Sequence, residues 1–472
     1  MENLQFVFPE IFVSLSIMFL LILGVFKKDS SILIHNISLL VLLISAVIIF
    51  NEIIEIEKTY LFNGSVVIDY LSSLMKIITL LAAFIVLAIS KSYLKITKIL
   101  KIEYPILILS SVLGMMIMMS SNDLIVFYMG LELQSLALYV LATFNRNNLK
   151  SSEAGLKYFV LSALSSGLLL YGCSLIYGFS GSTNFDTIAF QLNSNEYALT
   201  FGIVFILVGL AFKISAVPFH MWAPDVYEGS PTTVTLFFTM VPKIAALTVF
   251  IRFLYVPFLN LIDQWQMILV FLSIASMLFG AIAAIGQTNI KRLIAYSSIG
   301  HIGYALAGLA SSSNDGIQSS IMYITIYIIM NLGLFSCLLM MKKNNEYYEN
   351  LEDLSGLSKH HPLLSLSLLI ILFSLAGIPP LAGFFAKFYI FKAVIEQSMY
   401  FLAIVGLLST VIAAFYYLRI IKIIYFDPEK EKYDQDHSPW LKFSLTISTI
   451  LILFYFIFPS QLIEVVSRIN II

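Results

Sequence analysis

Fourteen apolar runs follow one another along this chain, each close to the roughly 20 residues that an α-helix needs to cross a bilayer. Hydrophobic residues make up 59% of the 472 residues and charged residues only 12%, against about 25% charged residues in a soluble domain. The sequence therefore predicts an all-α polytopic membrane protein with a single integral membrane domain, 1–472. The predicted spans are 5–26, 31–50, 68–90, 104–121, 123–144, 154–178, 200–226, 231–256, 265–286, 290–311, 317–341, 363–395, 399–425 and 440–461.

The seventh and twelfth runs are too long for one crossing and contain proline, at Pro218 and at Pro379-Pro380. Proline frees backbone carbonyls that lipid cannot satisfy, so a broken helix survives only where protein or water lines the break. Two breaks five spans apart, an odd offset, would lie in repeats of opposite orientation, as in many transporters. The sequence thus predicts two inverted repeats, approximately 104–256 and 265–425, with flanking helices in 1–103 and 440–461.

Basic residues gather in the odd-numbered connections between the runs, whereas the even-numbered connections carry acidic and polar residues. By the positive-inside rule the odd connections face the cytoplasm, which places both termini on the periplasmic side of a bacterial inner (plasma) membrane. The net charge of −1 gives no indication of nucleic-acid binding. The basic residues in question are Lys27, Lys28, Lys91, Lys95, Lys98, Lys101, Arg146, Lys150, Lys291, Arg292, Lys342, Lys343, Lys359, Lys422, Lys430 and Lys432.

Four charged residues, Glu132, Lys213, Lys243 and Lys387, lie inside the apolar runs. Each costs about 2.5–3.5 kcal/mol at the bilayer centre, so they are expected to serve a function. Burial destabilises a protonated lysine by about 4–7 kcal/mol and a neighbouring carboxylate opposes that effect. Moving one charge against about 150 mV requires roughly 3.5 kcal/mol. A lysine–carboxylate pair can therefore act as a proton switch, and the alternative for each lysine is to neutralise a helix end or to snorkel to the interface.

The tenth run is unusually polar, because Ser297 and Ser298 lie one helical turn before His301 and Tyr304 lies one turn after it. This spacing predicts a hydrogen-bonding file in which His301 either carries protons between lysines or ties helices together. Lys157, near the start of the sixth run, has two equally weighted interpretations, a relay site or a snorkelling side chain.

Polar residues near the ends of the runs have structural interpretations. Asp69 and Lys76, seven residues apart, are expected to form a structural pair on one helix face. Asp225 and Glu228 are expected to be cap or turn residues, or contacts to a cytoplasmic partner.

Motifs of soluble enzymes are absent from the sequence. It contains no glycine-rich phosphate loop, no catalytic-triad spacing and no H-E-x-x-H. Cys173 and Cys337 lie in separate runs without C-x-x-C spacing, which argues against cysteine-bound zinc, iron–sulfur clusters or c-type haem.

Several stretches resemble the antiporter-like membrane subunits of proton-pumping NADH:quinone oxidoreductase, respiratory complex I. The resemblance covers essentially the whole chain, and the second of its stretches is highly specific. These stretches are 130–136 (Gly-Leu-Glu-Leu-Gln-Ser-Leu), 213–231 (which includes Trp-Ala-Pro-Asp-Val-Tyr-Glu-Gly-Ser-Pro), 291–304 and 376–384.

The resemblance implies that Glu132 and Lys213 form the coupling pair, that Lys243 is the central relay, and that Lys387 serves the second half-channel. Quinone reduction in other subunits would supply the energy. NADH, FMN, iron–sulfur clusters and quinone would then bind to partner subunits and no cofactor or metal to this chain. The expected partners are the bilayer, an antiporter-like subunit M and small membrane subunits such as K.

Three other functions remain open at this point. A Na+/H+ antiporter of the related multisubunit type would use the same lysines. A quinone-site subunit would need a compact polar pocket, which the sequence does not indicate, and a purely structural scaffold would not need the four intramembrane charges.

Overall fold

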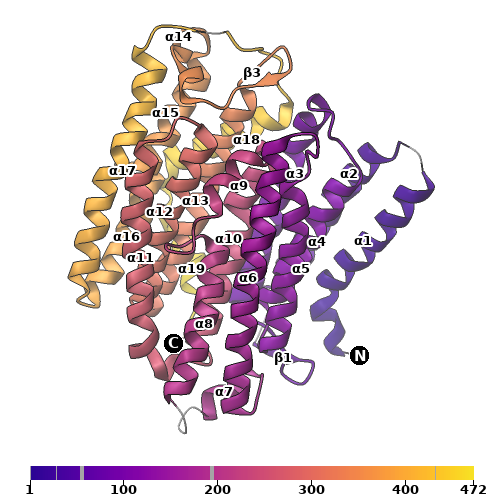
Figure 1. Ribbon diagram of the computed structural model, residues 1–472, viewed down its shortest axis with the longest axis vertical. Helices are drawn as coiled ribbons and strands as arrows, with labels where there is room; N and C mark the ends of the chain where they lie inside the picture. Colours follow the sequence, from indigo (N-terminus) through magenta and orange to yellow (C-terminus); the bar gives the residue numbers. More distant parts are fainter. Residues whose placement is uncertain (1, 28, 54–57, 192–195, 431, 472) are drawn as a thin grey trace.

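The computed structural model describes residues 2–27, 29–53, 58–191, 196–430 and 432–471. In these residues the chain is almost entirely helical, with two small antiparallel pairs of strands, β1 with β2 and β3 with β4 (Figure 1). The prediction of an all-α membrane protein is confirmed.

The elements follow the predicted order. The N-terminal flank consists of α1 (Phe8–Phe26), α2 (Ser31–Glu52), β1 (Thr59–Leu61), β2 (Val66–Ile68) and α3 (Tyr70–Ile96). The next set consists of α4 (Glu103–Met119), α5 (Leu124–Ala142), α6 (Leu149–Ser180), α7 (Phe185–Gln191), α8 (Glu196–Ile214), α9 (Ala223–Gly229) and α10 (Thr232–Tyr255). The third set consists of α11 (Ile262–Ile285), α12 (Ile290–Ala310), α13 (Asn314–Met340), β3 (Lys342–Lys343), β4 (Glu346–Tyr347), α14 (Leu357–His360), α15 (Pro362–Ala376), α16 (Ala382–Glu396) and α17 (Tyr400–Phe426). The chain continues with α18 (Pro439–Phe454) and α19 (Pro459–Ser467).

These helices overlap all fourteen predicted spans. Among the described residues, 11 helices are long and apolar enough to cross a membrane, and three shorter apolar helices occupy 103–119, 199–214 and 362–376. Both predicted breaks are present, between α8 and α9 and between α15 and α16, and each contains a cis X–Pro bond, Val217-Pro218 and Pro379-Pro380. The exact number of crossings stays a prediction.

Polar side chains fix where several of the helices begin. Asp69 accepts from the backbone N–H of Ser72 at the start of α3, Asp123 caps α5, Asn289 caps α12, and Ser313 caps α13. Each cap satisfies backbone donors that have no partner within the helix. The interruptions between the apolar runs are thus built into the sequence at defined residues.

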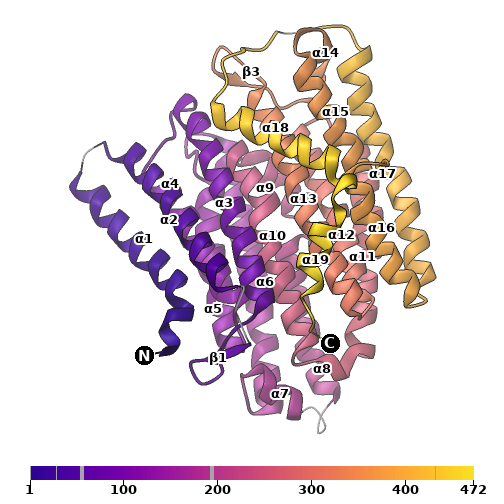
Figure 2. The same cartoon turned by 180° about the vertical axis from the view of Figure 1, so that it is seen from behind.

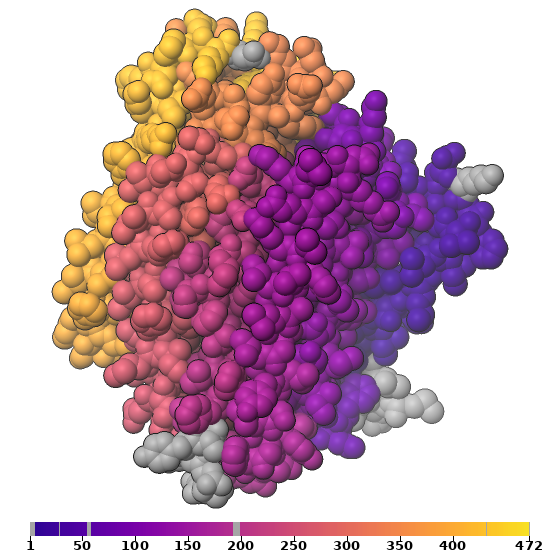
Figure 3. Space-filling model, in the orientation of Figure 1, coloured from indigo at the N-terminus to yellow at the C-terminus, as the bar shows by residue number. Residues whose placement is uncertain are grey.

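The two ends of the helical bundle differ. β3 and α14 lie at one end, and β1, α7 and the N-terminus lie toward the opposite end, as does the C-terminus (Figures 1 and 2). Across the bundle, α1 forms one edge and α16 and α17 the other (Figure 1), and the space-filling view shows N-terminal residues at one edge and C-terminal residues at the other (Figure 3). All residues of α10 are buried. The central helix is therefore shielded from lipid on all sides by the rest of the chain.

Glycines allow two pairs of neighbouring helices to approach closely. A Cβ on Gly114 of α4 would lie 2.5 Å from the backbone nitrogen of Gln134 in α5, and a Cβ on Gly280 of α11 would lie 2.6 Å from the nitrogen of Gly300 in α12. Small residues at helix contacts are characteristic of membrane bundles. The pair α4–α5 and the pair α11–α12 thus pack in the same way at corresponding places of the two predicted repeats.

Candidate functional site

Lys213 lies at the end of α8, just before the first break, and only 9% of it is exposed. Its ammonium donates to Ser162 Oγ of α6 at 2.7 Å, to Ser135 Oγ of α5 at 2.8 Å and to Tyr139 OH at 3.4 Å. Tyr139 in turn donates to Ser162 at 2.6 Å. The lysine is therefore surrounded by neutral hydroxyls, which stabilise its charge without a carboxylate in direct contact.

Glu132 lies three residues before Ser135 on α5 and is partly exposed on the outer face of the chain. Its Oε1 atom is buried and has no hydrogen-bond partner among the described residues. The carboxylate interacts electrostatically with Lys213, but the hydrogen bonds of the lysine go to hydroxyl groups. The two predicted partners thus lie close enough for their charges to interact, but they do not form a hydrogen bond with each other.

Lys243 lies in the middle of α10, after Pro242, and is 2% exposed. Its ammonium donates to Ser298 Oγ of α12. It also lies 5.9 Å from the ring centroid of Tyr227 and 5.8 Å from that of Tyr327, within the range of cation–π attraction. Aromatic faces and one hydroxyl are therefore its main surroundings.

His301 of α12 is 4% exposed and contacts two tyrosines. Its Nδ1 atom lies 2.6 Å from Tyr323 OH of α13 and its Nε2 atom lies 3.1 Å from Tyr417 OH of α17. Tyr417 OH also lies 2.6 Å from Ser297 Oγ. Since each hydroxyl can donate or accept, this cluster can exchange the direction of its hydrogen bonds.

Lys387 of α16 is 5% exposed and lies at the second break. Its ammonium donates to the carbonyl oxygens of Leu375 at 3.2 Å and Ala376 at 3.1 Å, which are the last two residues of α15, and it lies 5.0 Å from the ring centroid of Tyr304. A cation at a helix C-terminus satisfies free carbonyls and is favoured by the helix dipole.

Gly377 makes this arrangement possible. It ends α15 with φ of +88°, and a Cβ there would lie 3.1 Å from Lys387 Cδ. Both the backbone conformation and the approach of the lysine therefore favour glycine at this position.

Helix α12 connects these groups. Ser298, His301 and Tyr304 follow one another at intervals of three residues and so lie along one face of the helix. Ser298 contacts Lys243 and Tyr304 lies beneath Lys387, so His301 lies between the two lysines, with which it interacts electrostatically. The structure thus brings together the predicted central relay, the histidine and the second half-channel lysine.

Lys157 lies elsewhere. Its side chain is 41% exposed and forms ion pairs of 2.7 Å with both Glu153 and Asp225. Asp225 also pairs with Arg292 at 2.7 Å. Glu228, expected like Asp225 to be a cap or turn residue, joins the same cluster through Arg292 at 3.1 Å. These residues form a partly exposed network that links α6, α9 and α12, outside the line of buried lysines.

The expected Asp69–Lys76 pair is wrong. Asp69 pairs with Arg252 of α10 at 2.8 Å, and Lys76 pairs with Glu10 of α1 at 2.5 Å. Each residue pairs with a buried residue of another helix, and these tertiary contacts prevail over the spacing along α3. Glu10 is therefore a buried charged residue that sequence reasoning missed.

The hydroxyl groups around the lysines were also missed. Ser135 and Ser162 lie at Lys213, Tyr327 lies at Lys243, and Tyr323 and Tyr417 lie at His301, each on another helix than the residue it contacts. The signal that could have found two of them is the one-turn spacing of Tyr323 and Tyr327 within an apolar run, where buried tyrosine hydroxyls usually have a polar partner. Tyr327 OH is buried and has no hydrogen-bond partner among the described residues.

The fold and the line of buried lysines define a class, the antiporter-like membrane subunits. The family model described as "NADH:quinone oxidoreductase/Mrp antiporter, TM" matches residues 121–413. A protein of Pelagibacter ubique named NADH-quinone oxidoreductase subunit N is 76% identical over 472 residues, which are 100% of both chains. Its namesake from Parvibaculum lavamentivorans is 50% identical over 459 residues, 96% of this chain and 94% of the relative.

Solved structures agree. A chain of respiratory complex I from Thermus thermophilus with bound aureothin matches with a TM-score of 0.84 and 29% identity, over 97% of this chain and 98% of that chain. A chain of the Mrp complex from a Dietzia species has a TM-score of 0.87, over 98% and 96% of the two chains, but 22% identity, and so shows the fold alone. The chain belongs to the NADH:quinone oxidoreductase/Mrp antiporter family and, within it, to the subunit N group of proton-translocating NADH-quinone oxidoreductase. This assignment confirms the sequence-based function and disfavours a separate Na+/H+ antiporter.

Proposed function

We propose that Glu132, Lys213, Lys243, His301 and Lys387 form the proton relay through which this subunit couples quinone reduction elsewhere in the complex to proton pumping. One observation carries the proposal: the buried Lys243 of α10 and the buried Lys387 of α16 contact the same face of α12, and His301 of α12 lies between the two contacts. Lys213 of α8 and Glu132 of α5 form the part of the relay at which protons enter.

The surroundings of the lysines suit reversible protonation. Lys213, Lys243 and Lys387 contact hydroxyls, aromatic faces and carbonyls, and none of them has a carboxylate in direct contact among the described residues. A directly paired carboxylate would hold the proton on a buried lysine, because breaking such a pair costs about 3–5 kcal/mol. Neutral partners leave the protonation of each lysine to charges that do not contact it directly, such as Glu132 near Lys213, which can then act as the switch.

Two inverted repeats, α4–α10 and α11–α17, would supply the two half-channels. The broken helix of each repeat carries a lysine near its break, Lys213 in α8 and Lys387 in α16. The matching glycine contacts of α4 with α5 and of α11 with α12 support this division. Irregular backbone at membrane depth lines such pathways in transporters.

The partners follow from the subunit N assignment. The partly exposed Glu132 of α5 suits contact with a neighbouring membrane subunit. We infer subunit M and small subunits such as K as neighbours, with NADH, FMN, iron–sulfur clusters and quinone bound by partner subunits. We also infer that both termini lie on the periplasmic side of a bacterial inner membrane, which the lysine-rich connections support through the positive-inside rule.

The first experiment is a native gel of the tagged chain extracted in mild detergent. Co-migration with an assembly that oxidises NADH with quinone is expected, and migration with a small cation-transport assembly would contradict the proposal. Proton uptake into inverted vesicles, driven by NADH, then compares Lys213→Ala with Lys392→Ala. Lys392 is a suitable control because its side chain is 58% exposed and pairs only with Glu396 among the described residues. Full-rate uptake by Lys213→Ala would refute the relay.

A further inference from the structure

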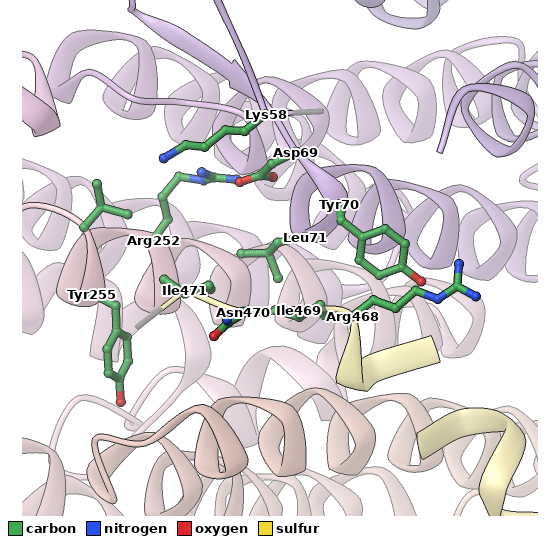
Figure 4. Close-up of a pocket in the computed structure, with 11 residues that line it drawn as sticks. Lys58, Asp69, Tyr70, Leu71, Arg252, Tyr255, Arg468, Ile469, Asn470 and Ile471 are labelled. Carbon is green, nitrogen blue, oxygen red and sulfur yellow. The ribbon is translucent and has the colours of Figure 1, made fainter. Parts of the chain in front are cut away.

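A cationic cavity lies at the end of the bundle where the C-terminus is found, away from the relay. Its volume is about 400 Å³, and it lies where α3 begins, α10 ends and the chain leaves α19 (Figure 4). Among the described residues that line it, Lys58, Arg252 and Arg468 are the cations and Asp69 is the one acid. The side chains of these lining residues therefore carry a net charge of +2.

The centre of the cavity is a built site. Arg252 is 3% exposed, and its Nη2 donates to Asp69 at 2.8 Å while its Nε donates to the carbonyl of Met119 at 3.1 Å. A guanidinium has five N–H donors, so these two bonds leave donors for a ligand. Asp69 holds the arginine in place and neutralises one of the three positive charges.

The outer cations are available to an anion. Lys58 is exposed, and its ammonium lies 5.1 Å from the ring centroid of Tyr60. Arg468 pairs with Glu464 at 3.8 Å, but both side chains are largely exposed, at 58% and 77%. An exposed pair of this kind contributes little, so it competes weakly with a bound anion.

The wall formed by residues 468–471 is held in place by the neighbouring helices. Gln318 of α13 donates to the carbonyl of Ile469 at 2.9 Å, and Asn314 accepts from the N–H of Ile471 at 3.2 Å. Tyr70 of α3 donates to the carbonyl of Val465 at 3.0 Å. Hydrogen bonds to α13 and to α3 thus hold the C-terminal wall of the cavity in place.

A partly exposed apolar face of α3 begins beside the cavity. Tyr70 and Leu71 line the cavity, and Leu74, the pair Ile77 and Ile78, and Leu81 follow on α3 at helical spacing, with Leu81 44% exposed. Ten residues of helix, from 71 to 81, span about 15 Å. This is half of the roughly 30 Å hydrocarbon core, the depth of one leaflet.

We propose that this cavity binds the phosphodiester headgroup of an anionic phospholipid, with an acyl chain along the Leu74–Leu81 face of α3. The net positive lining of described residues fits the phosphate, the partly exposed Tyr70 is of the type enriched at membrane interfaces, and the apolar face of α3 fits the chain. The lipid would join α3 of the N-terminal flank to α10 and to the segment after α19.

The test is photo-crosslinking in nanodiscs, with the chain in the assembly in which it is extracted. The probe is phosphatidylglycerol with a photoreactive group in an acyl chain, and labelled peptides are mapped by mass spectrometry. Labelling is expected on residues 70–81. Each cation near a membrane surface strengthens the binding of an anionic lipid about fivefold. The double variant K58Q/R468Q, which removes two cations, should therefore reduce the labelling about 25-fold. Arg252 is left unchanged because its pairing with Asp69 is structural.

Matched variants separate charge from folding. K58R/R468K preserves both charges and should keep the labelling, and K392Q removes an equally exposed cation elsewhere and should also keep it. Equal labelling of the parent chain and K58Q/R468Q would overturn the proposal. So would equal labelling by a phosphatidylcholine probe, or full displacement by millimolar inorganic phosphate, which would indicate a site for free anions.

Discussion

The ammonium of Lys387 donates a hydrogen bond to the carbonyl oxygen of Ala376 at 3.1 Å, across the second helix break. It thereby joins the N-terminal half of a broken helix to the C-terminal half, since Ala376 ends α15 and Lys387 lies in α16. A lysine proposed to carry protons is thus also the cap of a helix end.

Lys387→Gln is expected to lower both proton pumping and stability. The amide can still donate to one carbonyl, but the charge at the helix end is lost, which is worth up to about 2 kcal/mol in a partly buried site. Thermal unfolding of the purified assembly measures the stability, with K392Q on the same helix as control. An unchanged melting temperature for K387Q would show that the charge at the end of α15 contributes nothing to the stability of the fold.

Ser162→Ala should weaken pumping without abolishing it. Ser162 accepts from Lys213 at 2.7 Å and from Tyr139 at 2.6 Å, so its removal costs the lysine one of three hydroxyl partners. A hydrogen bond to a charged group is worth about 1.5–3 kcal/mol, so a slowing of about tenfold or more is expected. Initial rates of NADH-driven proton uptake measure this slowing. Ser110→Ala is the control, because among the described residues Ser110 bonds only to the carbonyl of Ile106 in its own helix.

Lys243→Arg distinguishes charge from proton transfer. The guanidinium keeps the positive charge, but it does not release a proton under physiological conditions. If Lys243 is the central relay, Lys243→Arg should abolish pumping as completely as Lys243→Ala. Uptake of protons at the parental rate by Lys243→Arg would show that only a fixed charge is required. Assembly of each variant, checked on a native gel, excludes a folding defect as the cause.

The helix breaks could be predicted from the sequence because their cause is local. Pro218 and the pair Pro379-Pro380 remove backbone donors within apolar runs, and both interruptions occur where expected. The face of α12 that carries Ser298 and His301 could also be predicted, since spacing along one helix fixes it.

The partners across helices could not be predicted in this way. Ser162 and Lys213 form a hydrogen bond although they are 51 positions apart in the sequence, and Tyr417 and His301 do so at a separation of 116 positions. The wrong pairing of Asp69 with Lys76 has the same origin, because a single sequence gives spacing within a helix but no contact between helices.

Lys157→Arg should leave pumping nearly unchanged if the residue acts only in its ion-pair network. Its side chain is 41% exposed and forms ion pairs with Glu153 and Asp225. Both carboxylates can also accept hydrogen bonds from a guanidinium. Asp225→Asn should then have an effect as small as that of Lys157→Ala, about 1 kcal/mol or less in stability. A loss of proton uptake in Lys157→Arg, with Asp225→Asn unaffected, would instead assign Lys157 to the relay. The comparison therefore decides the role that its position in the sequence left open.

The ion pair between Glu10 and Lys76 permits a test of stability that does not involve the relay. The side chains are 9% and 3% exposed and their charged atoms lie 2.5 Å apart, joining α1 to α3. Removing one partner leaves a buried unpaired charge, so Glu10→Gln is expected to destabilise the fold by about 3–5 kcal/mol. The double variant Glu10→Gln/Lys76→Met removes both charges and should recover most of the loss. Thermal unfolding of the parent, the two single variants and the double variant gives the coupling energy directly. A double variant no more stable than Glu10→Gln alone would mean that the charges act independently, because a true pair requires the second substitution to relieve the first.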